Sequence, residues 1–271
     1  MTAEAPSAKF PFSLTTTRLR DQWHGASRSG LVGALAGAMP AVELAPASLQ
    51  RIGAADDDLV RVTSARGQLV LPIRANEGLA ETLAVIPMHY GQRWLPASAG
   101  VNALTVAATD PLSKQPELKH AAVQIEPASF GWHLVALGWL HGEDRHSQAE
   151  TLRAAAASAS YAAIAVFGRE EGRDSGRLGV IVSVAHDERL PTLVDLCVRL
   201  LRVAVDSPTL RDAGAHRLRR VQLANGRIAA VVLEGRHRSD VAACSAYRSL
   251  IEHGTDCSRH SLRELFAPAG S

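Results

Sequence analysis

The chain has 271 residues, of which 46% are hydrophobic, and its formal net charge is +2 at pH 7. This length and composition allow one large domain or two small ones, each with a hydrophobic core. The nearly balanced charges argue against the basic surface of a nucleic-acid-binding protein, so we expect no nucleic-acid partner.

The first 127 residues have the pattern of short strands separated by turns. Strands are expected within residues 10–14, 42–44, 58–74, 82–88 and 121–127. The 58–74 segment is a hairpin that turns at Arg66-Gly67, and a short helix before Gly53 ends at that glycine. Many short strands with long connections are typical of a small closed barrel.

Residues 128–271 alternate between helical and strand patterns, which places a domain boundary near Pro127. A capping-box pattern from Ser147 to Glu150 predicts the start of a helix over residues 147–160. Further elements are expected as a strand at 177–185, an amphipathic helix at 190–205, a hairpin turning at Asn225-Gly226 and a helix at 241–253. The prediction is therefore a barrel at 1–127 and a smaller α+β domain at 128–271.

The cysteines and the N-terminal residues indicate the cellular compartment in which the protein is expected. The three cysteines, Cys197, Cys244 and Cys257, are odd in number and widely separated, which favours a reducing environment over a disulfide framework. The first twelve residues lack the basic stretch and apolar core of a secretory signal. The least polar run, 154–168, is too short to span a bilayer. We expect a cytoplasmic protein with no membrane partner.

Residues 15–30, "TTTRLRDQWHGASRSG", concentrate the groups that bind ligands. Arginine side chains bind phosphate oxygens in a bidentate way, and threonine hydroxyls and free backbone N–H groups complete an anion site. Trp23 and His24 suit a heteroaromatic ring. The residues alone fit a diphosphate site and, equally, an exposed basic loop with Trp23 in the core.

Two motifs carry a resemblance to a known family. The sequence "LTTTRLRDQWHGASRSG" stands where the family has roughly "LNTGRxRDQWHTMTRTG", and "PMHYGQRW" leads into a second matching segment that contains "VNALT" and ends in "IEP". On these motifs, residues 10–126 resemble the molybdopterin-dinucleotide-binding domain at the C-terminal end of assimilatory nitrate reductases, in the dimethyl-sulfoxide-reductase superfamily. The resemblance implies a six-stranded double-psi β-barrel that caps a bis(molybdopterin guanine dinucleotide) cofactor.

The matching positions imply which residues contact the cofactor. They are Thr16, Thr17, Arg18, Arg20, Trp23, His24 and Arg28 in the first motif, and His89, Asn102 and Lys119 in the second. Arg18 and Lys119 would serve anionic or pterin groups, and the Asn102 amide would bind a heterocycle edge. Asp110 and Glu117 are expected to order their own loop, because carboxylates beside a diphosphate would repel it.

Alternatives remain for individual positions. His89 also fits a core histidine, Asn102 a turn residue and Lys119 a solvated surface lysine. Thr17 replaces the glycine of the family pattern, so either the turn there is not left-handed or the local contact is weaker. Gly25 replaces the family threonine after the histidine.

The resemblance also implies parts that this sequence does not contain. The family uses a metal-ligating side chain from an earlier segment and an iron–sulfur cluster held by an N-terminal cysteine motif, and no C-x2-C-x3-C pattern occurs here. We therefore expect neither a catalytic residue nor an iron–sulfur cluster in this chain, no nitrate reduction by the chain alone, and a catalytic large subunit as partner. The chain would be a split subunit, a fragment or a relic; Met1 and the short polar lead favour an independent gene product or an engineered piece.

The tail "GTDCSRHSLREL" is only weakly similar to the "GTxCGSC" end of a [2Fe-2S] module, with Cys257 in a matching place and His260 where the last cysteine would stand. A metal site of Cys244, His253, Cys257 and His260 is a minor alternative to an ordinary helix end. Residues 218–250 resemble a linker before that module, which assigns the second domain a docking role at best.

Two other functions stay open: a non-catalytic nucleotide- or protein-binding module, and a formate dehydrogenase component, whose family more often has "HWHTG" where "QWHGA" stands.

Overall fold

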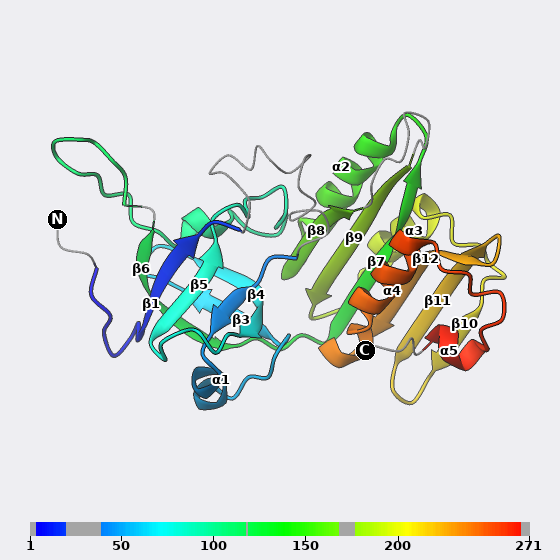
Figure 1. Ribbon diagram of the computed structural model, residues 1–271, viewed down its shortest axis with the longest axis horizontal. Coiled ribbons are helices and arrows are strands. Elements are labelled where there is room, and N and C mark those ends of the chain that lie inside the picture. Colours follow the sequence, from blue (N-terminus) through cyan, green and yellow to red (C-terminus); the bar gives the residue numbers. More distant parts are fainter. Residues whose placement is uncertain (1–3, 20–38, 118, 168–176, 267–271) are drawn as a thin grey trace. The chain divides into compact units, whose positions relative to one another are not determined.

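The computed structural model describes residues 4–19, 39–117, 119–167 and 177–266 (Figure 1). The chain forms two compact units, Met1–Ser129 and Phe130–Ser271. The division falls two residues after the expected boundary at residue 127. Within the described residues, no helix has the length and apolar character needed to cross a membrane.

The first unit is a closed six-stranded barrel, as predicted. Its strands are β1 (Phe12–Thr17), β2 (Val42–Leu44), β3 (Leu59–Thr63), β4 (Gln68–Ala75), β5 (Leu83–Pro87) and β6 (His120–Pro127). They close in the order β1-β5-β2-β4-β3-β6. The expected helix is α1 (Pro46–Ile52), and Gly53 ends it in the left-handed conformation with φ 71°, as predicted.

Two parallel strand pairs give the barrel its topology. β1 lies parallel to β5 and β2 lies parallel to β4, while β5 and β2 meet in antiparallel orientation. The chain therefore passes from β1 to β2 across the position of β5, and from β4 to β5 across the position of β2. These two crossed connections are the feature that the term double-psi describes.

Alternating side chains fill the barrel interior. β1 buries Phe12, Leu14 and Thr16, and leaves the residues between them partly exposed. The same alternation buries Val60 and Val62 on β3. A strand that presents one side chain in two to the interior stabilises the fold through burial of apolar area, about 1.5–3 kcal/mol for each fully buried large side chain.

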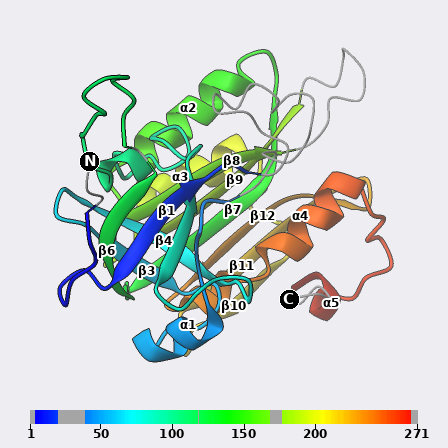
Figure 2. The ribbon, with the colours of Figure 1, turned by 60° about the vertical axis from the view of Figure 1, so that its left-hand side comes forward.

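The second unit is an antiparallel sheet with helices on both faces. Its strands are β7 (Trp132–His141), β8 (Tyr161–Phe167), β9 (Arg177–His186), β10 (Thr209–Asp212), β11 (Arg217–Ala224) and β12 (Arg227–Gly235), in the order β10-β11-β12-β7-β9-β8. Figures 1 and 2 show α2 (Arg145–Ala156) and α3 (Pro191–Leu200) against one face and α4 (Cys244–His253) against the other. A short α5 (Leu262–Phe266) follows. This confirms the α+β prediction.

The structure corrects two helix predictions. α2 begins at Arg145, so Ser147 lies inside the helix and the predicted capping box is wrong; the Ser147 carbonyl instead accepts the Thr151 hydroxyl at 2.9 Å. α3 ends at Leu200 rather than at residue 205. Arg202 takes a left-handed φ of 54°, and its N–H bonds to the Arg199 carbonyl, so a helix-terminating turn overrides the apolar periodicity.

Strands were missed where the alternation is absent. β7 is buried on both faces along most of its length, so it shows no alternation between polar and apolar residues. β8 follows an alanine-rich helix that was expected to run to residue 160 and ends at Ala156. The predicted hairpin turn is confirmed, because Asn225 and Gly226 have φ values of 51° and 73°, as a two-residue turn between twisted strands requires.

Candidate functional site

One end of the barrel brings three connections together, and we call it the rim. β1 and β5 run parallel with Thr17 opposite Pro87, so both strands finish at the rim. β6 runs antiparallel to β1 with His120 opposite Thr15, so it starts there. The β3–β4 turn reaches the same end, because β3 is antiparallel to β6. The connections 18–41, 64–67 and 88–119 therefore all leave from the rim.

Backbone hydrogen bonds place the two predicted motifs side by side at the rim. The Thr16 N–H donates to the Lys119 carbonyl at 3.3 Å, and the Met88 N–H donates to the Thr17 carbonyl at 2.8 Å. Arg18 and His89 are the residues that follow directly along these two segments. Arg18 and Lys119 thus lie at the same end of one barrel, and both are exposed.

The first motif is only partly described. Arg20, Trp23, His24 and Arg28, together with Gly25, lie outside the described residues, so their expected roles stay predictions.

β1 continues through Thr17, so the threonines belong to the strand and not to the loop that was expected after residue 14. Thr16 is 4% exposed and lies inside the barrel wall. Its predicted cofactor contact stays a prediction. Thr17 sits in extended backbone opposite Pro87, so replacing the family glycine with threonine requires no left-handed strain at this position.

Gly100 brings the Asn102 segment against the His89 segment. Gly100 has φ 81°, and a Cβ there would lie 2.8 Å from the Gly91 Cα. The Val101 N–H donates to the Tyr90 carbonyl at 3.2 Å, so the short helix η1 (Val101–Ala103) begins next to the residue that follows His89. Only glycine allows this approach of two backbones. The side chain of Asn102 is exposed, whereas His89 is half-buried.

The carboxylates of the second motif order their own loop, as expected for Asp110. Its Oδ1 accepts hydrogen bonds from the Ser113 N–H at 2.7 Å, the Leu112 N–H at 3.0 Å and the Ser113 hydroxyl at 3.0 Å. These bonds hold the pKa of Asp110 below its usual range. The Glu117 carboxylate accepts the Lys119 N–H at 3.3 Å.

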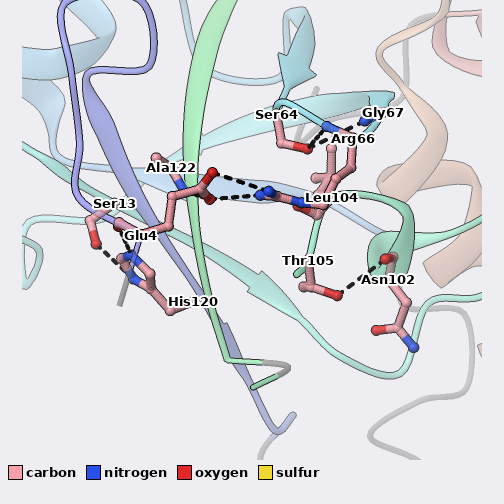
Figure 3. A network of polar contacts seen from close by, with 10 residues as sticks. All are labelled: Glu4, Ser13, Ser64, Arg66, Gly67, Asn102, Leu104, Thr105, His120 and Ala122. Carbon is pink, nitrogen blue, oxygen red and sulfur yellow. Dashed lines mark hydrogen bonds and ion pairs between the residues drawn. The ribbon is translucent and has the colours of Figure 1, made fainter. Parts of the chain in front are cut away.

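A polar network at the rim was not recognised from the sequence (Figure 3). The Arg66 guanidinium donates to both carboxylate oxygens of Glu4, at 3.0 and 2.6 Å, and its Nε–H donates to the Leu104 carbonyl at 3.2 Å. The sequence pattern predicts Arg66 only as a turn residue. Because Glu4 lies 62 positions away along the chain, no local pattern could have paired them.

The donor set at the rim fits a ligand that carries both phosphate and heterocycle. Arg18 and Lys119 supply positive charge, and the exposed Asn102 amide can both donate to and accept from a ring edge. Two carboxylates of this region are engaged within the protein, Glu4 by Arg66 and Asp110 by its own loop. The exposed side chains at this end therefore include two cations and an amide.

Two cysteines of the second unit, Cys197 and Cys257, are buried. Burial raises the pKa of the Cys197 thiol to about 12 and also raises that of Cys257. The Cys257 N–H donates to the Gly226 carbonyl at 2.6 Å, which joins the tail to the β11–β12 turn. Across the described residues, no group of three His, Cys, Asp or Glu side chains, including Cys244, His253, Cys257 and His260, is placed to hold a metal ion.

The first unit is a closed β-barrel whose rim presents exposed cationic and amide side chains, and comparison with known proteins shows what it is similar to. Residues 12–122 match the molydopterin dinucleotide binding domain family. Nearly all of the barrel unit therefore matches a molybdopterin dinucleotide-binding domain, and the relatives that share this stretch include nitrate reductases and a formate dehydrogenase.

Three curated relatives illustrate this similarity. The chain is 37% identical over 133 residues to a nitrate reductase of Klebsiella oxytoca, covering 48% of this chain and 15% of that protein. It is 34% identical over 128 residues to a periplasmic nitrate reductase of Desulfovibrio desulfuricans, covering 46% and 16%. It is 32% identical over 126 residues to the F420-dependent formate dehydrogenase subunit alpha of Methanocaldococcus jannaschii, covering 46% and 18%. The chain thus matches less than a fifth of the length of each relative.

Proposed function

We propose that this chain is the cofactor-capping component of a molybdenum-dependent nitrate reductase. In this role its barrel holds bis(molybdopterin guanine dinucleotide) while a catalytic partner segment carries out the two-electron reduction of nitrate to nitrite. The observation that carries the proposal is the meeting of Arg18 and Lys119 at one barrel end through the Thr16–Lys119 hydrogen bond. Two of the relatives described above are nitrate reductases, which supports this substrate over others.

Each rim residue has a role that its chemistry supports. Arg18 binds phosphate oxygens with its planar fork, and Lys119 adds a point charge to the same anion. Asn102 binds the edge of the guanine or pterin, and His89 contributes a ring nitrogen. When bound, the molybdenum cofactor supplies oxygen-atom transfer and two-electron redox chemistry. The chain's own contribution is preorganised positioning and charge compensation rather than proton transfer.

The proposed partner is a large subunit or segment that carries the metal-ligating residue and the iron–sulfur centre. The aligned residues correspond to 15–18% of the relatives' length, and in this proposal the other parts of a reductase are supplied by that partner. We place the complex in the cytoplasm, because the odd number of widely separated cysteines favours a reducing compartment. The second unit would then dock onto the partner.

Co-expression with a candidate large subunit tests the proposal. The co-purified complex is measured for molybdenum by mass spectrometry and for GMP released by acid hydrolysis. The double variant Arg18→Gln, Lys119→Gln should lose about tenfold or more of the bound GMP, because two charge-assisted contacts to phosphate are removed. The control Lys114→Gln changes an exposed lysine whose ammonium donates to the Pro111 carbonyl, and it should keep the GMP. Equal GMP in all three complexes would refute the proposal.

A formate dehydrogenase component is the second candidate, because one of the three relatives is a formate dehydrogenase subunit. Nitrate reduction and formate oxidation by the same loaded complex separate the two. A complex that binds GMP but carries no molybdenum would instead support a non-catalytic nucleotide-binding module.

A further inference from the structure

Arg66 is held in a defined direction by its own turn. The Ser64 hydroxyl accepts the Arg66 N–H at 3.1 Å, and the Ser64 N–H donates to the Gly67 carbonyl at 2.9 Å. Gly67 lies directly against η1, since a Cβ there would meet the Ala103 carbonyl oxygen at 2.9 Å. The turn is therefore packed against the segment that carries Asn102, and the Arg66 side chain starts from a fixed backbone.

The guanidinium joins this turn to two other segments. Its Nε–H donates to the Leu104 carbonyl, one residue after η1, while its two terminal nitrogens bind both oxygens of Glu4. Three contacts from one planar group require the arginine fork, which lysine cannot reproduce. The side chains of Arg66 and Glu4 are 27% and 28% exposed, so solvent screens this pair only in part.

Glu4 is in turn hydrogen-bonded to β6, the strand that begins directly after Lys119. Its carboxylate accepts the Ala122 N–H at 3.0 Å. The His120 Nε2 donates to the Glu4 carbonyl at 2.5 Å, which leaves Nδ1 to accept the Ser13 hydroxyl at 3.2 Å. The N-terminal segment at Glu4 is thus tied to both β1 and β6 (Figure 3). Lys119 directly precedes His120, the first residue of β6.

We propose that Arg66 is a positioning residue of the rim: through Leu104 and Glu4 it fixes the Asn102 turn relative to the β6 start that bears Lys119. This inference rests on the proposed function for its purpose, since a cofactor bound by Asn102 and Lys119 needs both at a set separation. The positioning itself is a property of the chain without any ligand. It can therefore be tested independently.

Hydrogen exchange of the full chain is the direct test. The N–H groups of Ala103, Leu104 and Thr105 bond to the carbonyls of Gly100, Val101 and Asn102, so their exchange reports whether the turn is held. Arg66→Gln should raise exchange at these three amides about tenfold, with the barrel strands unchanged. Arg66→Lys should not restore protection, and Glu4→Gln should fall between, because it removes one acceptor oxygen only.

Arg51 provides a matched control within the same barrel. Its Nη1 lies 3.3 Å from the Glu81 carboxylate, and the two side chains are 49% and 62% exposed. This pair joins α1 to the residues before β5, at the barrel end away from the rim. Arg51→Gln should leave exchange at residues 103–105 at the wild-type rate.

Two results would overturn the inference: wild-type exchange at residues 103–105 in Arg66→Gln, or a uniform rise across all barrel strands, which would indicate general stability instead of local positioning. GMP content of the co-expressed complex is read separately. Faster exchange with GMP lost only in Arg66→Gln supports both proposals. If Arg66→Gln raises exchange at residues 103–105 but the wild-type complex binds no GMP, the positioning role is supported and the proposed function is refuted.

Discussion

The two units use their charged side chains in opposite ways. At the barrel rim, Arg18 and Lys119 are exposed, and nearby carboxylates are engaged by other groups of the protein. In the sheet unit, two buried carboxylates are held by arginines that remain partly exposed: the Arg189 guanidinium donates to both oxygens of Glu234, and Arg217 pairs with Asp240. The exposed basic side chains of the rim are suited to an external anion, whereas these two carboxylates of the sheet unit are neutralised by arginines of the same unit.

The largest expected effect comes from breaking the internal charge pairing of the sheet unit. Glu234 is 4% exposed and accepts hydrogen bonds from the Trp132 indole at 3.2 Å and the Arg189 Nε at 2.6 Å. Glu234→Ala should lower the unfolding free energy of this unit by about 4 kcal/mol, because it leaves a cavity and an unpaired buried indole N–H. Urea unfolding followed by hydrogen exchange in β7 and β12 measures the loss.

The control for this variant is Glu252→Ala. Glu252 pairs with Arg248 four residues earlier on α4, and such helix-surface pairs contribute only about 0.5 kcal/mol. Equal losses for the two variants would contradict the view that buried pairing stabilises the sheet unit.

The stability of the sheet unit is expected to depend on pH through the buried His133. Burial, with the nearby Arg238 charge, lowers its pKa from 6.5 to about 4. The folded state therefore excludes a proton that the unfolded chain binds, so stability is full above pH 6.5 and falls as the pH drops toward 4. The total loss is on the order of 3 kcal/mol. Urea unfolding at several pH values should show this slope, and His133→Phe should flatten it; an unchanged slope in the variant would assign it to other groups.

A smaller effect is expected at the rim from Gly100→Ala. The left-handed φ of 81° and the 2.8 Å approach to the Gly91 Cα make any side chain strained there. The expected cost is about 2 kcal/mol, localised to the Asn102 segment. Gly91→Ala is the matched control, since an added Cβ at Gly91 meets nothing within 4 Å. Faster exchange of η1 amides in Gly100→Ala alone would confirm the prediction, and equal behaviour of the two variants would argue against it.

The smallest expected effect is an acid dependence of the Arg66 contact. Hydrogen bonding to Arg66 lowers the pKa of Glu4 below its ordinary 4.5. Its contribution is therefore present above pH 4.5 and is lost as the pH falls through the lower value of the folded state. Exchange at residues 103–105, corrected for intrinsic rates, should begin to rise only below pH 4.5. In Arg66→Gln this pH dependence should disappear, and its persistence would separate Glu4 from the effect.

Much of the barrel could be predicted because its strands alternate. Val60 and Val62, for example, point inward from a strand whose intervening Arg61 is partly exposed, and glycine favours the left-handed conformation that ends α1 at Gly53. In the sheet unit, the Asn225-Gly226 turn was predictable in the same way from its residue types. β7 could not be predicted from alternation, because it is buried on both faces. The end of α3 could not be predicted either, because it depends on a left-handed conformation at Arg202, which arginine does not favour.

The candidate site was predictable only in part. The resemblance named Arg18 and Lys119, and the strand register explains why residues about a hundred positions apart meet. The Glu4–Arg66 contact could not be predicted, because it depends on where the N-terminal segment returns to β6 rather than on any pattern near either residue. The position of Thr16 could not be predicted either, because it depends on how far β1 extends. The strand runs to Thr17, so the Thr16 side chain points into the barrel.

If the two motifs act together at one barrel end, hydrogen exchange of the co-expressed complex should show it. Complexes are compared from cells able and unable to make the molybdenum cofactor. Loading should protect the amides at residues 17–19, 88–89 and 119–120 together, because these segments adjoin at the rim. Protection of one segment without the others, or of none, would contradict it.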